Sequence, residues 1–265
     1  MKAKKSYGQH FLIHEQVAQR IAGSLTGAGA YRHILEVGPG KGMLTKYLTA
    51  LPYDLVAVEA DLDMVAYLQQ HYPAVTVLSA DFLQLDITNC FQGEPFAIIG
   101  NFPYNISTQI LFKMLDYRSE VPELVGMFQK EVAERVIAPP GSKVYGITSV
   151  LVQAFYEGKY LFTVDRRNFS PPPKVQSGVI RLIRREQPLV TESEVLFKKV
   201  VKQAFSQRRK MLRNTMKPFL EGDPLLEDPF FQQRPEQLSV ADYVQIVKWI
   251  VERSKETLIN PHKPS

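Results

Sequence analysis

Residues 95–105 read Pro-Phe-Ala-Ile-Ile-Gly-Asn-Phe-Pro-Tyr-Asn, a short apolar run followed by a polar loop. A continuous run of this length is typical of a β-strand covered on both faces, as in a parallel sheet. Asn101 then offers an acceptor oxygen and a two-donor amide nitrogen. Pro103 stiffens the turn, and Tyr104 offers a flat ring. The loop is therefore suited to a planar group that carries an amine, with a plain turn after a core strand as the alternative.

The composition is that of a globular protein, and its modest positive charge favours a polyanionic partner only where the basic residues cluster. The chain has 265 residues, of which 45% are apolar, and its net charge is +5. This length accommodates one large domain and a small one. A single cysteine and five histidines argue against an internal disulfide and a structural zinc site. No apolar run approaches the ~18 residues of a membrane helix, and the basic N-terminus lacks an apolar signal region. We therefore expect a cytoplasmic protein without a metal.

A glycine-rich turn comes earlier in the chain, within residues 33–42, His-Ile-Leu-Glu-Val-Gly-Pro-Gly-Lys-Gly. The pattern predicts a strand, a turn at Gly38 and Gly40, and a helix whose first N–H groups face a ligand. A dinucleotide fingerprint needs its third glycine one place later, where Met43 stands. The spacing therefore argues against NAD.

Two acids follow the next two predicted strands. Residues 55–58 end at Glu59, and residues 75–78 are followed by Asp81. At the carboxyl edge of an open α/β sheet, Glu59 is placed to bond ribose hydroxyls and Asp81 to accept from an exocyclic amine. A lone acid at a strand end is more often a surface cap, but two successive strands share this feature. Asn101 falls at the same edge, so we expect a parallel α/β sheet that binds a nucleoside.

The second half of the chain predicts a strand pair, 160–164 and 178–183, that closes the sheet. Between them Phe169 precedes three prolines that could hold it in place, or it packs in the core. A composition shift near residues 184–188 predicts a sheet domain, 1–186, and a helical domain, 187–265.

A basic stripe follows in the predicted helical domain. Residues 198–217 contain eight Lys or Arg and no acid, which favours contact with phosphates over a merely solvated face. Arg208 falls on the apolar side of a helical wheel, so the helix need not be continuous. The stripe residues of interest are Lys202, Arg209, Lys210 and Arg213.

These motifs, in this order, resemble those of the rRNA adenine N6-dimethyltransferases over roughly residues 5–250. The resemblance rests on residues 8–12 (GQHFL), 36–42 (EVGPGKG), 101–104 (NFPY), 169–177 (FSPPPKVQS) and 204–210 (AFSQRRK), with Glu59 and Asp81. Phe102 stands where the family usually has Leu. The similarity is greatest to the bacterial small-subunit (16S) enzymes whose loss confers kasugamycin resistance.

The resemblance implies a Rossmann-like class I methyltransferase sheet with a small C-terminal all-helical domain, and S-adenosylmethionine as methyl donor. It assigns the donor to His10, Leu12, Gly38, Gly40, Glu59, Asp81 and Asn101. It implies transfer to N6 of two adjacent adenosines near the 3′ end of small-subunit rRNA, within an immature small ribosomal subunit. A monomer is the default expectation.

The expected acceptor site holds a flipped adenine at Asn101 and Pro103, between the rings of Tyr104 and Phe169. Two alternatives stay open. One is a large-subunit rRNA adenine methyltransferase of the macrolide-resistance type. The other is a non-catalytic ribosome-assembly or RNA-binding factor on the same scaffold.

Overall fold

The computed structural model describes residues 9–27 and 29–259, which form two compact units. The sheet unit comprises the described residues up to Glu134 together with Glu157–Arg184. The helical unit comprises Arg135–Tyr156 and the chain from Arg185 onward. The predicted division assigned residues 135–156 to the first domain instead. They group with the second because its chain pairs with them: Arg185 N–H donates to the Phe155 carbonyl at 2.8 Å, and Leu189 N–H to the Ala154 carbonyl at 2.9 Å.

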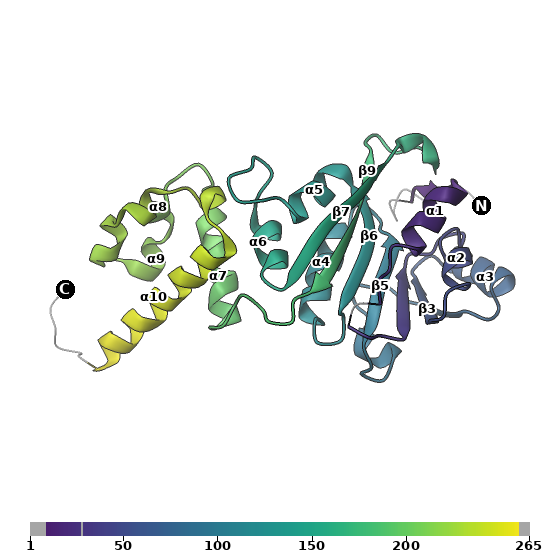
Figure 1. The fold of residues 1–265 in the computed structure, drawn as a ribbon, viewed down its shortest axis with the longest axis horizontal. Helices are drawn as coiled ribbons and strands as arrows, with labels where there is room; N and C mark the ends of the chain where they lie inside the picture. The colour runs from purple at the N-terminus through teal and green to yellow at the C-terminus, as the bar shows by residue number, and fades with distance from the viewer. Residues whose placement is uncertain (1–8, 28, 260–265) are drawn as a thin grey trace. The chain divides into compact units, whose positions relative to one another are not determined.

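The sheet unit is built on seven strands in the order β4-β3-β2-β5-β6-β9-β7 (Figure 1). The pairs β2–β3, β3–β4, β2–β5 and β5–β6 are parallel, and β9 runs antiparallel to β6. The strands are β2 (His33–Val37), β3 (Asp54–Glu59), β4 (Thr76–Ser79), β5 (Phe96–Asn101), β6 (Glu123–Gln129), β7 (Tyr156–Val164) and β9 (Ser177–Arg184). The predicted α/β fold is confirmed, with a sheet that is mostly parallel.

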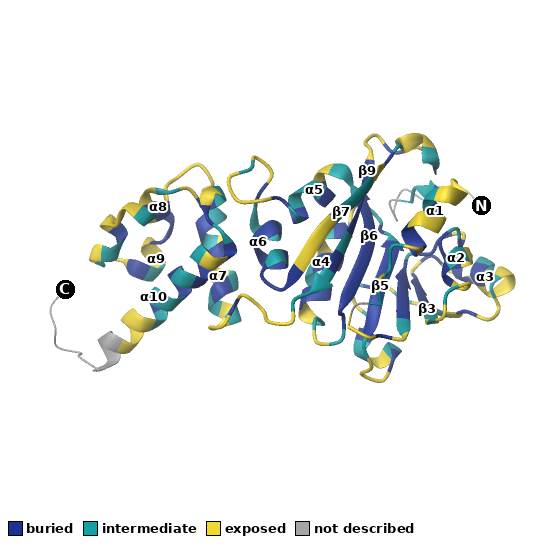
Figure 2. Ribbon diagram, in the orientation of Figure 1, coloured by how far each residue is buried: buried dark blue, intermediate teal, exposed yellow. Residues whose placement is uncertain are grey.

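The central strands owe their position to their apolar side chains. Phe96, Ala97, Ile98 and Ile99 of β5 are all fully buried, and β5 and β6 are buried along nearly their whole length in Figure 2. Helices pack along the sheet and supply the other side of this core. They are α1 (Glu15–Ala22), α2 (Thr45–Leu48), α3 (Leu62–His71), α4 (Ser107–Asp116) and α5 (Lys130–Val136), with 3₁₀ turns η2 (Ile87–Cys90) and η3 (Arg166–Asn168).

The order of the strands creates a switch point beside β2. The chain proceeds outward from β2 to β3 and β4, then returns to the other side of β2 to form β5. In open α/β sheets, ligands bind in the crevice at the carboxyl ends of the strands where the order reverses. The turn after β2 and the loop after β5 therefore flank the expected binding crevice.

A second, two-stranded sheet fastens the N-terminal arm to the sheet unit. Strand β1 (Phe11–Leu12) pairs antiparallel with β8 (Phe169–Ser170), and Leu12 lies opposite Phe169. Both side chains are at most 5% exposed and join one hydrophobic cluster. The first eight residues, which the resemblance includes in part, lie outside the described residues.

The helical unit contains short helices and one long one. They are α6 (Ile147–Gln153), α7 (Glu194–Phe205), α8 (Leu212–Thr215), α9 (Lys217–Leu220) and α10 (Val240–Ile259), with 3₁₀ turns η4 (Pro224–Glu227), η5 (Pro229–Gln232) and η6 (Pro235–Gln237). The basic stretch 198–217 is not one helix, because α7 ends at Phe205 and the next helix begins at Leu212. Within the described ranges, no helix is both long and apolar enough to cross a bilayer.

Candidate functional site

A pocket of about 460 Å³ opens at the carboxyl ends of β2 to β5, entirely within the sheet unit. The arm, the glycine turn after β2 and the loops after β3, β4 and β5 line it. The structure brings nine of the predicted site residues to this pocket: His10, Leu12, Gly38, Gly40, Glu59, Asp81, Asn101, Pro103 and Tyr104. Phe169 is not among the described residues that line it.

The glycine turn approaches the arm so closely that a side chain at Gly40 would crowd the Phe11 ring. Gly40 has φ +57°, and a Cβ there would stand 3.1 Å from the Phe11 ring. Its N–H donates to Glu59 Oε2 at 3.1 Å. The turn therefore presents bare backbone to the pocket and is tied to the end of β3.

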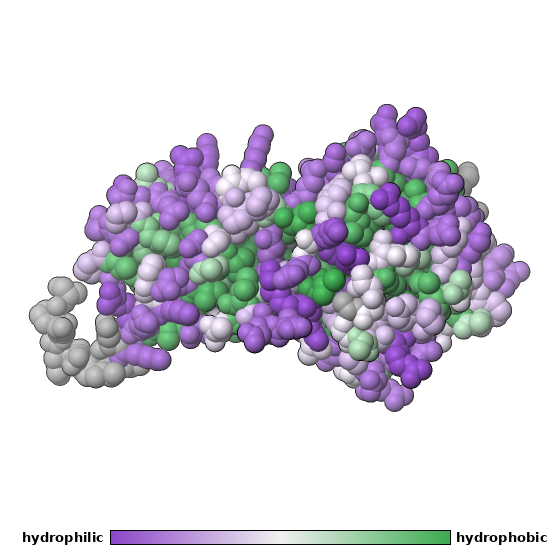
Figure 3. Space-filling view, viewed as in Figure 1, coloured by the Kyte–Doolittle hydropathy of each residue, from purple (hydrophilic) through white to green (hydrophobic). Residues whose placement is uncertain are grey.

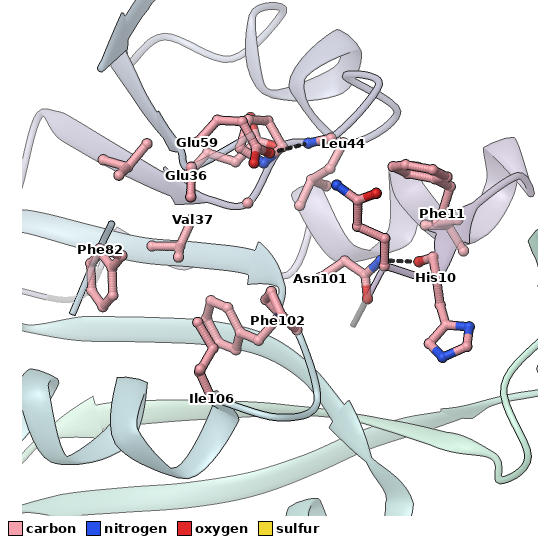
Figure 4. Close-up of a pocket in the computed structure, with 18 of the residues that line it drawn as sticks. His10, Phe11, Glu36, Val37, Leu44, Glu59, Phe82, Asn101, Phe102 and Ile106 are labelled. Atoms are coloured by element: carbon pink, nitrogen blue, oxygen red, sulfur yellow. Dashed lines mark hydrogen bonds between the residues drawn. The ribbon is translucent and has the colours of Figure 1, made fainter. Parts of the chain in front are cut away.

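The carboxyls of Glu36, on β2, and Glu59, at the end of β3, lie near each other in the pocket (Figure 4). Glu59 is 7% exposed, and its Oε1 also accepts from Asp61 N–H at 2.9 Å. Burial raises the pKa of Glu59, and the backbone N–H groups that donate to it oppose the rise. A carboxylate has about four acceptor sites, and the N–H groups of Gly40, Ala60 and Asp61 use three of them, so about one remains for a ligand hydroxyl.

Glu36 is a pocket residue to which the sequence analysis gave no role. Its side chain is 1% exposed and accepts from Thr45 Oγ1 at 2.7 Å. Burial, with a smaller contribution from the nearby Glu59 carboxyl, raises the pKa of Glu36 to about 8. The sequence feature that could have identified Glu36 is an acid within the apolar strand 34–37, because a buried charge is costly unless it is compensated.

Asp81 is exposed and caps the turn after β4. Its carboxylate accepts from Leu83 N–H at 2.9 Å and from Gln84 Nε2 at 3.0 Å. Lys113 of α4 also holds this loop, because its ammonium donates to the carbonyls of Leu83, at 3.0 Å, and Leu85. Asp81 is thus both a cap and a pocket residue, and Lys113 fixes the loop that carries it.

Asn101 is oriented by the arm. Its Nδ2 donates to the His10 carbonyl oxygen at 3.0 Å, as Figure 4 shows. No group of the described residues donates a hydrogen bond to Asn101 Oδ1. The amide therefore has a fixed orientation with its oxygen available to an incoming N–H group.

Tyr104 is held from two sides. Its hydroxyl lies 2.6 Å from Ser177 Oγ, and its ring centroid is 5.5 Å from that of His10 with an interplanar angle of 32°. The His10 ring is itself fixed by a contact of 2.8 Å between Nδ1 and the Pro171 carbonyl. Burial raises the pKa of Tyr104, so its hydroxyl stays protonated at neutral pH.

Phe169, which the sequence analysis expected opposite Tyr104, packs in the core and is not among the described residues that line the pocket. It is 3% exposed and packs in the hydrophobic cluster that contains Leu12 and Ile21. The cause is the pairing of β1 with β8, which directs Phe169 inward opposite Leu12. The ring nearest to Tyr104 in the described pocket is that of His10.

The predicted RNA-contact residues lie in the helical unit. Lys202 is on α7, Arg209 and Lys210 are in the turn that follows, and Arg213 is on α8; all four are exposed. No acidic side chain in the described part of the chain pairs with any of them. Arg208 differs, since it donates to the Lys143 carbonyl at 2.7 Å. The face seen in Figure 3 is hydrophilic over much of its surface.

Comparisons with known proteins agree on the family. The family model described as "Ribosomal RNA adenine dimethylase" matches residues 1–252. A "Ribosomal RNA small subunit methyltransferase A" of Flavobacterium johnsoniae is 50% identical over 94% of this chain and 96% of its own. A protein of the same description from Bacteroides fragilis is 48% identical over 98% of this chain and 96% of its own.

Solved structures show the same fold. A dimethyladenosine transferase from Plasmodium falciparum covers 92% of this chain and 98% of its own with a TM-score of 0.78 at 23% identity. The 23S rRNA methyltransferase ErmE covers 89% of this chain and 99% of its own with a TM-score of 0.66 at 26% identity. The sheet, the pocket at its switch point and these similarities agree: the chain belongs to the ribosomal RNA adenine dimethylase family.

Proposed function

We propose that this chain transfers methyl groups from S-adenosylmethionine to N6 of two adjacent adenosines near the 3′ end of small-subunit (16S) rRNA, giving N6,N6-dimethyladenosines. The observation that carries the proposal is the Asn101 amide, which the His10 carbonyl orients beside the ring of Tyr104. The names of the relatives that are 48–50% identical support the small-subunit substrate over the large-subunit alternative.

The residues present fit the methyl donor. The bare glycine turn admits a ligand close to its backbone, and Glu59 retains an acceptor site for a ribose hydroxyl. His10, Leu12, Gly38, Gly40, Asp81 and Asn101 complete the donor site that we propose. Bound S-adenosylmethionine supplies an electrophilic methyl group.

The acceptor side of the pocket would activate a poor nucleophile. The lone pair of adenine N6 is delocalised into the ring, so the nitrogen must become tetrahedral to react. Hydrogen bonds from its NH₂ group to Asn101 Oδ1 and to a backbone carbonyl near Pro103 favour that geometry. Tyr104 stacks on the base, a contact worth on the order of 1–3 kcal/mol. Positioning and electrostatics then supply most of the rate without a general base.

The helical unit would orient the rRNA. Phosphate contacts position a nucleic acid and carry no sequence information by themselves. Exposed, unpaired cations at Lys202, Arg209, Lys210 and Arg213 suit this role. We propose the immature small ribosomal subunit in the cytoplasm as the substrate particle. The monomeric state stays a prediction.

The test is methyl transfer from tritiated donor to small subunits that lack the modification, followed by mapping of the methylated base. Methylation of naked large-subunit rRNA would favour the large-subunit alternative. Failure to bind the donor would favour the non-catalytic alternative. Asn101→Ala should lower turnover at least about hundredfold, as loss of one oriented electrostatic contact in an active site does. Asn89→Ala, at an exposed asparagine of η2, is the matched control. Near-normal turnover of Asn101→Ala would remove Asn101 from the mechanism.

A further inference from the structure

We propose that Ser177 is a positioning residue, which fixes the plane of the Tyr104 ring so that a flipped adenine meets a preset stacking surface. The inference deepens the proposed function and rests on it. Ser177 Oγ lies 2.6 Å from the Tyr104 hydroxyl, and the serine is fully buried. It acts through Tyr104 alone and does not touch the substrate.

The topology explains why a residue 73 positions away reaches Tyr104. Strand β9 runs antiparallel to β6, so it begins at the edge where the parallel strands end. Its first residue, Ser177, lies opposite Gln129, the last residue of β6. The sheet therefore delivers a buried hydroxyl to the rim of the pocket, next to the loop that follows β5.

Tyr104 needs such an anchor because of where it lies. It follows Pro103 in a loop, and its ring can rotate about two side-chain torsions unless something holds its far end. The hydrogen bond to Ser177 fixes the hydroxyl, and the His10 ring restricts one face. A ring held at both points stacks on a base without a further loss of rotamer freedom on binding.

The hydroxyl of Ser177 can be removed without disturbing the backbone pairing of β9. The strand is held to β6 by backbone pairing from residue 177 to 183, and Lys130 N–H donates to the Gln176 carbonyl at 2.9 Å. Ser177→Ala leaves these bonds intact and removes only the contact with Tyr104. The matched control is Thr163→Val on β7, because Thr163 Oγ1 also bonds a tyrosine hydroxyl, that of Tyr160, at 2.8 Å. Neither Ser177 nor Thr163 lines the pocket.

The kinetic test is a double-mutant cycle of Ser177→Ala and Tyr104→Phe in methyl transfer to unmodified small subunits. Each single variant should lower kcat about tenfold, the effect of one net hydrogen bond, while the Kd for the donor stays unchanged. The double variant should be no slower than either single variant, since both remove the same contact. Thr163→Val should match the wild type.

Fluorine NMR of protein labelled with fluorotyrosine gives a readout that does not need activity. The Tyr104 resonance is identified by its absence from Tyr104→Phe, and it should shift or broaden in Ser177→Ala but not in Thr163→Val. An unchanged Tyr104 resonance in Ser177→Ala would overturn the inference. So would an equal loss of kcat from Ser177→Ala whether residue 104 is Tyr or Phe. If the wild type transfers no methyl to rRNA adenosine, the proposed function fails while the resonance still decides whether Ser177 fixes the ring.

Discussion

Glu36→Gln should remove a pH-dependent loss of stability in the sheet unit. Burial raises the pKa of Glu36 from 4.5 to about 8 in the fold. Because the folded pKa lies above the unfolded one, the stabilisation is complete below pH 4.5 and is lost as the pH rises through 8. The loss reaches about 1.4 kcal/mol per pH unit, hence up to about 4 kcal/mol between pH 5 and pH 8. Glutamine keeps an acceptor for Thr45 and does not ionise.

The assay is urea unfolding at several pH values between 5 and 8, followed by circular dichroism for wild type and variant. The single tryptophan, Trp249, is in α10, so its fluorescence reports the helical unit separately. The difference in unfolding free energy between the two proteins isolates Glu36 from all other titrating groups. It should move in favour of the variant as the pH rises.

Thr45→Val provides a second test of the raised pKa of Glu36. The Thr45 hydroxyl donates to Glu36 and thereby lowers the pKa that burial raises. Its removal should shift the window of pH dependence upward. Parallel stability curves for wild type and Glu36→Gln across the whole range would refute the reasoning, because they would show that Glu36 does not titrate there.

Three further predictions concern the loop after β4, the glycine turn and the basic stripe. Lys113→Met should weaken donor binding by up to about thirtyfold in calorimetry, because two hydrogen bonds to carbonyls of the loop after β4 are lost at roughly 1 kcal/mol each; an unchanged Kd contradicts this. Gly42→Ala should lower the unfolding free energy by at least about 1–2 kcal/mol, since φ is +77° and a Cβ would stand 2.3 Å from the Tyr72 ring; an equal melting temperature contradicts it. Alanine at Lys202, Arg209 and Arg213 should reduce the slope of log K against log salt for rRNA by about 2–3. The same slope as in a control with alanine at Arg32, Lys159 and Lys248 would disprove the stripe assignment.

The sheet and its ligand edge could be predicted because short-range patterns determine them. Apolar runs mark β2 to β6, and the polar residues after them, such as Glu59 and Asn101, fall at one edge whatever the details of packing. The pairing of β1 with β8 could not be predicted, since a two-residue strand leaves no periodic signal. The inward position of Phe169 follows from that pairing.

Tertiary contacts also determine where the helices of the helical unit begin and end. The basic stretch matches a helical wheel, yet the chain leaves the helix after Phe205. Lys210 N–H closes a turn on the Gln207 carbonyl at 2.8 Å, and Leu212 N–H donates to the Gln233 carbonyl at 2.9 Å. The first bond is a local turn and the second joins residues 21 positions apart, and together they replace helical bonds that are lost. The contact between Ser177 and Tyr104 could not be predicted either, because 73 positions separate the two residues.

The attachment of the arm to β8 has a consequence for protein synthesis. His10 and Pro171 are in contact although 161 positions separate them, so the wall of the pocket that bears His10 and Leu12 cannot form until most of the sheet unit has left the ribosome. Contacts this distant in sequence close late in folding. A nascent chain, or a fragment that ends before β8, would have the glycine turn and Asn101 but no arm to orient the amide, and so should remain unable to act on its substrate until the sheet unit is complete.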